Sequence, residues 1–225
     1  NSFRQARDTD PTQVQHRINL AAALLKTGQF DVAIRELDTA FELDPASVAA
    51  QVYAAEAEVA LGRVEEAKAR LKSVVEAHPD AVNLWFRLGN LSLESGDYAG
   101  GVKNFRRANS LVPDDPTIAG NLAWILATAP DPAIRNGAEA IRLATVAVRA
   151  TQRQSASPLD ALAAAYAEAG RFDEAKATAD AALQLLDGEQ LEELAAAIAN
   201  RREGYAKRRP FRLKPSPTTD VDVKP

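Results

Sequence analysis

The residue types that most often carry catalysis or metal binding are scarce in this 225-residue sequence. It contains no cysteine, which excludes thiolate nucleophiles, thiolate metal sites and disulfides. The two histidines, His16 and His78, are far apart along the chain, and no spacing of histidines and carboxylates indicates a metal centre. Phosphate-loop, dinucleotide-binding and serine-nucleophile motifs are also missing. We therefore expect no catalytic residues, no metal and no cofactor.

Three weaker motifs admit both a functional and a structural interpretation. Gly100-Gly101 could cradle a phosphate, but no strand precedes the pair and no lysine follows at the required spacing, so close helix packing is favoured. Asp220 and Asp222 resemble part of a calcium loop that lacks its glycine and its distal glutamate. Asn90-Leu91-Ser92 fits a glycosylation sequon, yet it is expected inside a helix. We favour the structural interpretation of all three.

A repeat of 34 residues organises the elements that would position any site. Three prolines and three glycines recur with this spacing: Pro45, Pro79, Pro113, Gly28, Gly62 and Gly96. A glycine in the middle of the unit and a proline at its end indicate two antiparallel helices joined by a short turn. The repeated region shows no alternation of period two, so no strand is expected.

Residues typical of helix ends support the same hairpins. The glycines, with Gly170, are expected in the left-handed conformation that ends a helix. Polar residues are expected to cap the helices at Asp10, Ser47, Asp80, Asp115 and Ser157, and at Asp31, Asp97 and Asp173 for the second helices.

One unit carries a nearly complete family signature. Its residues resemble the tetratricopeptide repeat (TPR) pattern: Trp85, Leu88, Gly89, Gly96, Tyr98, Phe105, Ala108 and Pro113. The resemblance covers residues 11–200 or so and implies an all-α fold, an α-α superhelix of five helix pairs with a C-terminal capping helix and an extended tail. We divide the chain into a lead-in (1–10), a solenoid (11–203) with repeats 14–47, 48–81, 82–115, 116–155 and 156–189 and a capping helix at 189–203, and a basic, proline-rich tail (204–225).

The fourth repeat is longer than the others, with its extra residues around Pro130-Asp131-Pro132, between Thr128 and Asn136. This segment is similar to the long-loop repeat near the end of many bacterial TPR proteins, which are often exported or fused to membrane segments. The compartment stays open, with a periplasmic or membrane-linked location as the analogy. Because the sequence starts at Asn1, we expect an excised or processed chain.

The resemblance implies a function in protein binding. In related repeats, four positions of each first helix face a concave groove, which here implies a partner-binding site at Ile18, Leu25, Val52, Glu56, Val59, Asn83, Phe86, Asn90, Leu93 and Trp124. The same positions of the fourth and fifth repeats also include Thr117, Gly120, Ala127, Ser157, Asp160, Ala164 and Ala167. The set has no lysine or arginine, so the carboxylate clamp of some co-chaperones is missing. An apolar peptide segment suits this groove, unless curvature buries the strip.

Basic residues are concentrated near the end of the sequence. Residues 201–214 carry a net charge of +6, and since the whole chain carries −4, the remainder carries −10. The basic residues are Arg201, Arg202, Lys207, Arg208, Arg209, Arg212 and Lys214. They could contact phosphates, lipid headgroups or an acidic partner, or Tyr205 and Phe211 could dock on the last helix. We favour docking, and the acidic remainder disfavours nucleic acid as a partner.

Three functional hypotheses follow. The first is a non-catalytic interaction scaffold or assembly factor that binds a protein or peptide segment in the groove. The second is a regulatory fragment of a larger membrane-bound bacterial enzyme, such as a glycosyltransferase, with the catalytic part before Asn1; a multi-span apolar region encoded upstream would favour it. The third is a homo-oligomeric scaffold in which the basic tail enters a neighbour's groove.

Overall fold

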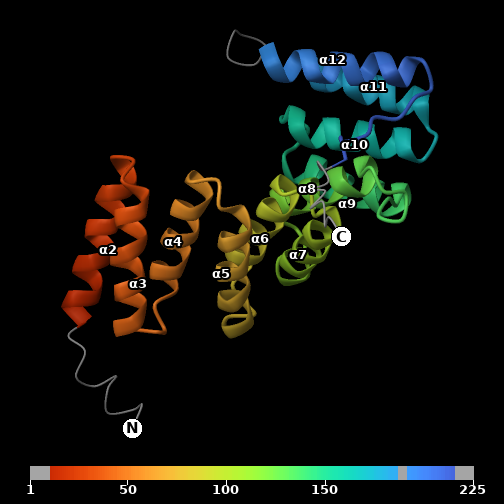
Figure 1. The fold of residues 1–225 in the computed structure, drawn as a ribbon. Coiled ribbons are helices and arrows are strands. Elements are labelled where there is room, and N and C mark those ends of the chain that lie inside the picture. Colours follow the sequence, from red (N-terminus) through yellow and green to blue (C-terminus); the bar gives the residue numbers. More distant parts are fainter. Residues whose placement is uncertain (1–10, 187–191, 216–225) are drawn as a thin grey trace, which may run out of the picture. The chain divides into compact units, whose positions relative to one another are not determined.

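The structure, a computed structural model, describes residues 11–186 and 192–215, and within these ranges it is all-α without a strand. The first six helices are α2 (Pro11–Lys26), α3 (Phe30–Leu43), α4 (Val48–Ala60), α5 (Val64–Ala77), α6 (Val82–Glu94) and α7 (Tyr98–Leu111). The rest are α8 (Pro116–Thr128), α9 (Gly137–Ala150), α10 (Ala156–Glu168), α11 (Phe172–Leu183) and α12 (Glu192–Ala206). Successive helices form hairpins, and α12 follows the last of them (Figure 1). The prediction of an all-α fold is confirmed.

Four of the hairpin turns depend on a glycine with a left-handed backbone. Gly28, Gly62, Gly96 and Gly170 have φ angles of 73°, 76°, 74° and 76°. A side chain at such a position costs free energy, so glycine is the residue that ends the first helix at the least cost. The prediction of left-handed glycines at these turns is confirmed.

The expected caps fall into two groups. Ser47, Asp97 and Asp115 cap their helices, each accepting hydrogen bonds from backbone N–H groups of the first turn. Asp31 and Asp173 instead lie one residue inside their helices, whose N-cap positions are Gln29 and Arg171, so this part of the prediction is wrong. Inside the first turn, a carboxylate still interacts favourably with the positive end of the helix dipole. Ser157 is likewise inside α10, where Ser155 holds the N-cap position.

The Gly100-Gly101 pair belongs to one of these caps. The N–H of Gly100 donates to Oδ1 of Asp97 at 2.8 Å. A Cβ atom at position 100 would lie 2.1 Å from Oδ2 of the same carboxylate, so a larger residue would displace the cap. The structural interpretation of this pair therefore holds at Gly100, although the close contact is with the capping carboxylate and not with a neighbouring helix.

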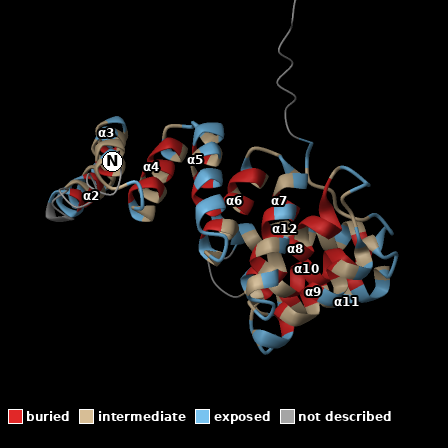
Figure 2. Ribbon diagram, turned by 90° about the horizontal axis from the view of Figure 1, so that it is seen from below, coloured by how far each residue is buried: buried red, intermediate tan, exposed pale blue. Residues whose placement is uncertain are grey.

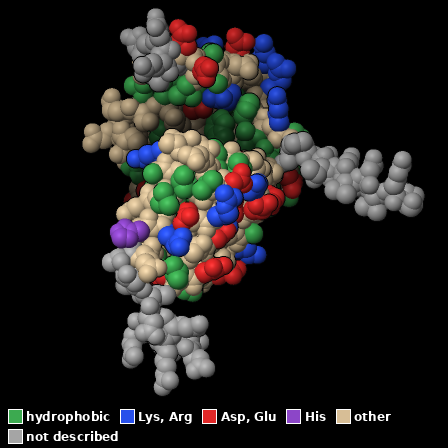
Figure 3. Space-filling view, turned by 60° about the vertical axis from the view of Figure 1, so that its left-hand side comes forward, with side chains coloured by type: hydrophobic (Ala, Val, Ile, Leu, Met, Phe, Trp, Pro, Cys, Tyr) green, Lys and Arg blue, Asp and Glu red, His purple; other side chains and the backbone are tan. Residues whose placement is uncertain are grey.

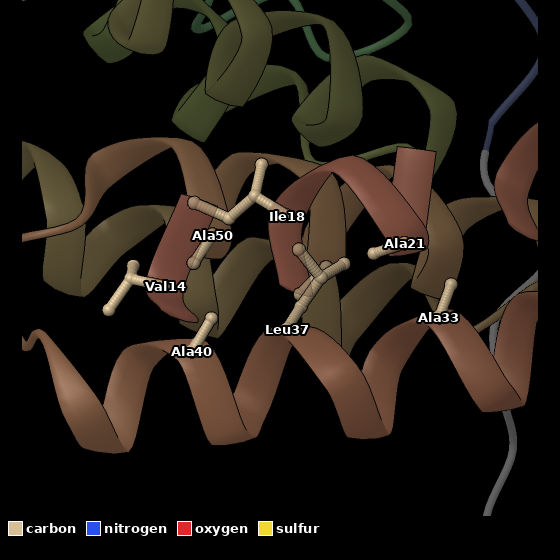
Figure 4. Close-up of a cluster of buried hydrophobic side chains, with 8 residues drawn as sticks. Val14, Ile18, Ala21, Ala33, Leu37, Ala40 and Ala50 are labelled. Carbon is tan, nitrogen blue, oxygen red and sulfur yellow. The ribbon is translucent and has the colours of Figure 1, made fainter. Parts of the chain in front are cut away.

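The chain divides into two compact units, residues 1–91 and 92–225. The core of unit 1 contains small and branched side chains from α2, α3 and α4, among them Val14, Ile18 and Leu37 (Figure 4). Five alanines of this cluster, at positions 21, 33, 40, 50 and 54, are fully buried. Because alanine occupies little space, the helices of consecutive hairpins can approach closely, which explains its abundance in the sequence.

A buried charge network joins three helices of unit 1. Oε1 of Glu58, on α4, accepts hydrogen bonds from Nε and Nη2 of Arg70, on α5, at 2.9 and 2.6 Å. The same guanidinium donates to Asp38, on α3, and to Gln51, on α4. Burial lowers the pKa of Arg70, but hydrogen bonds and attraction from Glu58 and Asp38 outweigh it, so the pKa is raised. The network fixes the contact between the first and second repeats.

Unit 2 has a more continuous core. Both α8 and α10 are buried over most of their length, as the red segments of Figure 2 show. The two helices pack against each other and against α9, and α10 also packs against α11. The loop between α8 and α9 contains Pro130 and Pro132, which cannot lie within a helix.

The last helix differs from the predicted boundaries. It continues to Ala206, three residues beyond the predicted end of the solenoid at 203, because Tyr205 is buried and anchors the final turn. Arg201 and Arg202, counted with the basic tail, are therefore helical residues. The predicted start of the capping helix at 189, the lead-in 1–10 and the motif at Asp220 and Asp222 lie outside the described residues.

Candidate functional site

Eight of the ten predicted groove residues lie in unit 1, on α2, α4 and α6. Ile18 is buried in the core of unit 1, so it presents no open surface to a partner. Leu25, Val52 and Val59 are partly buried and pack against the hydrophobic clusters. Only Asn83 of the eight is exposed, whereas Phe86 and Asn90 are partly buried. Much of the apolar strip in unit 1 thus contributes to the packing of the hairpins.

Charged residues are paired across the surface of unit 1. Glu56, one of the predicted groove residues, forms an ion pair with Arg87 of α6. Acidic and basic side chains are interspersed on the face that Figure 3 brings forward, and no extended patch of one sign is visible there. Exposed pairs of this kind contribute little to stability.

The other two predicted groove residues, Leu93 and Trp124, belong to unit 2 and are partly buried. Trp124 lines an open cavity with a volume of about 380 Å³, and the N-terminal halves of α8 and α10 form most of its wall. Four further positions that face the groove in related repeats also line it: Thr117, Gly120, Ser157 and Asp160. Asn121, Thr151 and Ser155 add an amide and two hydroxyls. The cavity therefore presents hydrogen-bonding groups beside an indole ring, as many ligand sites do.

A buried ion pair lies beside this cavity, and its acidic member, Asp160, lines the cavity wall. Arg201, on α12, donates from Nε and Nη2 to the two carboxylate oxygens of Asp160, on α10, at 3.0 and 2.7 Å. The side chains are only 10% and 8% exposed. Burial raises the pKa of Asp160, since desolvation outweighs the attraction of Arg201. Burial, with the nearby Asp160 charge, also raises the pKa of Tyr205.

Two aromatic rings pack against the same arginine, and one of them, Trp124, lines the cavity. The guanidinium of Arg201 lies 5.1 Å from the ring centre of Trp124 and 5.5 Å from that of Phe211. The two rings are 5.7 Å apart and tilted by 33°. A cation stacked on aromatic rings in a partly desolvated place is held strongly. Phe211 thus docks against α8 as well as α12, whereas the sequence predicted docking on the last helix alone.

The chain continues from Phe211 as an extended strap across unit 2 (Figure 1). Arg212 forms an ion pair with Glu168, at the end of α10, and Nη1 of Arg212 donates to the Ala127 carbonyl at 3.2 Å. The N–H of Leu213 donates to the Thr128 carbonyl at 2.8 Å, and the Tyr98 hydroxyl donates to the Lys214 carbonyl at 2.7 Å. We call residues 210–214 the C-terminal strap. Its docking surface is Tyr98, Trp124, Ala127, Thr128, Glu168 and Arg201.

Most of the predicted basic residues are engaged within the chain. Besides Arg201 and Arg212, Arg202 pairs with Asp180 of α11, and the Arg208 guanidinium lies 5.3 Å from the Phe172 ring centre. The side chains of Lys207, Arg209 and Lys214 are exposed. Four of the seven basic residues therefore contact acidic or aromatic groups of unit 2.

Sequence reasoning did not find the pairing of Asp160 with Arg201, although it named both residues in separate sets. The available signal was a single carboxylate in the alanine-rich run of α10, where a buried charge requires a partner. The contacts of the strap with the α8 carbonyls could not be predicted from the sequence, because every residue has a main-chain carbonyl whatever its type.

Helical hairpins that follow one another along the chain define the class of the fold as an α-helical repeat. The comparisons agree with this class. Residues 28–88 match the family model described as tetratricopeptide repeat. No curated protein matches the chain in sequence.

Solved structures extend the likeness to most of the chain. The crystal structure of MamA protein has 17% identity and a TM-score of 0.67, with 83% of this chain and 96% of that chain covered. YrrB, described as a TPR protein with an unusual peptide-binding site, has 19% identity and a TM-score of 0.66, with 88% and 98% covered. TTC0263, described as a thermophilic TPR protein in Thermus thermophilus, has 20% identity and a TM-score of 0.56, with 83% and 99% covered. Residues 28–88 therefore match the tetratricopeptide repeat in sequence, and the fold of most of the chain is similar to that of solved TPR proteins.

Two other kinds of site were sought in the described ranges. No group of three or more histidine, cysteine or carboxylate side chains there could hold a metal ion. Of the helices from α2 to α12, none has both the length and the apolar character that a membrane crossing requires.

Proposed function

We propose that this chain is a protein-interaction scaffold whose partner segment binds the first-helix surface, with the cavity of unit 2 as the principal contact. The observation that carries the proposal is the convergence of Thr117, Asn121, Trp124 and Ser157 on one open cavity. Hydroxyl and amide groups can bind the backbone of a peptide, and the indole can bind an apolar side chain. The repeat fold itself suits binding of other proteins.

Photo-crosslinking in the native host would test this proposal. A photoreactive residue at Thr117, on the exposed rim of the cavity, should trap a specific partner, which mass spectrometry would identify. The control places the same residue at Lys103, which is exposed on α7 and does not line the cavity. Identical products at the two positions would contradict a binding site in the cavity.

Purified partner then allows a quantitative test. We expect Asn121→Ala to weaken its binding at least ten-fold, equivalent to about 1.4 kcal/mol. The predicted groove of unit 1 is tested separately by replacing Phe86 and Asn90 together with alanine. Unchanged affinity in that double variant, with intact helicity, would confine the binding site to unit 2.

A further inference from the structure

We propose that the docking surface is a binding site for an extended segment in which an aromatic residue precedes an arginine, and that the C-terminal strap occupies it as an internal competitor. The inference deepens the proposed function, on which it rests for the existence of a partner, because it names the chemistry of the segment that the partner would offer.

The strap contacts unit 2 as a bound peptide would. It has no regular secondary structure, and it is held through one aromatic side chain, one arginine and two main-chain hydrogen bonds. Its residues Phe211, Arg212 and Leu213 are partly buried, whereas the core residues Leu122, Ile125 and Leu143, which belong to α8 and α9, are almost completely buried. We therefore expect unit 2 to keep its core when the strap contacts are lost.

The surface selects a cation at one position. Arg212 lies near the C-terminal ends of α8 and α10, where the negative ends of helix dipoles favour a cation, and its guanidinium donates to the Ala127 carbonyl of α8. Glu168, the last residue of α10, adds a carboxylate, which Arg135 also contacts at 3.1 Å. Arginine is suited to this place because its planar group can donate to a carbonyl and a carboxylate together.

The surface selects an aromatic ring at the preceding position. Phe211 contacts the indole of Trp124 and the guanidinium of Arg201, and Arg201 is itself held in place by the two hydrogen bonds that it donates to Asp160. An aromatic side chain gains from both contacts, whereas an aliphatic side chain would lose the attraction of the cation. The spacing of adjacent residues along an extended chain then places the arginine at the helix ends.

The strap and a partner segment compete for the same groups. Residues 207–209 are the only link between the end of α12 and the strap. Such a short link gives the strap an effective concentration of the order of mM at its site, so a free segment of equal intrinsic affinity binds poorly to the intact chain. Trp124 and Asp160 also line the cavity, so a partner segment in the cavity lies next to the strap. Displacement of the strap would extend the surface available to the partner.

A labelled peptide with the sequence of residues 207–215 is the probe. Fluorescence anisotropy would measure its binding to the full chain and to two full-length variants. Phe211→Ala with Arg212→Glu removes the ring and places a carboxylate opposite Glu168, which releases the strap. Arg209→Glu makes the same change of charge at an exposed side chain outside the strap and is the matched control. We expect the double variant to bind the peptide at least ten-fold more tightly than the wild type or the control.

Equal binding of the peptide by all three proteins, or no binding by any, would overturn the proposal, provided that circular dichroism shows the double variant folded. A measurement on the wild type covers the case in which that variant does not fold. The Leu213 amide is protected by its hydrogen bond to Thr128, and peptide at mM concentration should accelerate its hydrogen exchange. An unchanged exchange rate would mean that the strap is a fixed part of the fold. Peptide binding without cross-links at Thr117 would contradict the proposed function alone.

Discussion

Among individual residues, Asp160 has a position that the repeat pattern assigns to the groove and also pairs with a buried arginine, which the pattern does not indicate. It lies at a position that faces the groove in related repeats, yet it is 5% exposed and holds Arg201 against two aromatic rings. A buried ion pair contributes less to stability than to geometry, because desolvation offsets much of the attraction between the charges. Here the pair fixes the position of Arg201 beside Trp124, which belongs both to the cavity wall and to the docking surface.

The raised pKa of Asp160 leads to a prediction about pH. Its pKa in the folded state lies above the ordinary value of 3.8, so in the range just above pH 3.8 the folded chain binds a proton that the unfolded chain has lost. The contribution of Asp160 to the free energy of unfolding is therefore largest below pH 3.8 and decreases as the pH rises through the folded-state pKa. Asp160→Asn cannot titrate and lacks this contribution.

Urea unfolding of the wild type and Asp160→Asn at several pH values between about 3.5 and about 7 would measure the effect. We expect the stability of the wild type relative to the variant to decrease as the pH rises. An advantage of the wild type that grows with pH would show that Arg201 outweighs the cost of burial and that the pKa is lowered instead.

Among helices, the caps show how local sequence signals act and where they end. Asp115 accepts hydrogen bonds from the N–H groups of Thr117 and Ile118 at 2.9 Å, as its position before Pro116 predicts. Ser155 has the N-cap position of α10, but its side chain accepts no hydrogen bond from the helix. Both residues are good capping types, so the residue type alone does not decide whether a capping bond forms.

These two caps provide a matched pair of substitutions. Asp115→Ala should lower the free energy of unfolding by about 1 kcal/mol, because two N–H groups of α8 lose their acceptor. Ser155→Ala should have an effect of only about 0.5 kcal/mol or less, since no capping bond is lost. Equal losses in the two variants, measured by urea unfolding, would contradict the difference in capping.

The predictable part of the fold is local. Left-handed glycines and the proline-containing loop act within a few residues, so the sequence indicates them directly. The groove positions depend on the packing of helices from different repeats. Ile18 has the groove position in the sequence, but contacts with α3 and α4 bury it. The strap is less predictable still, since Leu213 and Thr128 interact through main-chain atoms far apart in sequence.

At the scale of the whole molecule, ion pairs account for part of the way in which charge is distributed along the sequence. Three arginines of residues 201–214 form ion pairs with acidic residues of unit 2, which are Asp160, Asp180 and Glu168. Pairs between adjacent repeats also occur in unit 1, where Arg63 contacts Asp31 and Arg70 contacts Asp38. Opposite charges that face each other in successive repeats favour one register of stacking.

The division into two compact units leads to a prediction about unfolding. In repeat proteins each hairpin is stabilised chiefly by its neighbours, so a local loss of packing has mainly local effects. Leu37 is fully buried in unit 1, and Leu143 is 2% exposed in unit 2. Replacement of either by alanine should cost about 2–5 kcal/mol, from lost burial and the cavity that remains.

Hydrogen exchange followed by mass spectrometry should show which helices lose stability in each variant. Leu37→Ala should accelerate exchange in α2 to α5 and leave α9 to α11 unchanged, and Leu143→Ala should give the reverse pattern. Acceleration throughout both units in either variant would mean that the chain unfolds as one cooperative body.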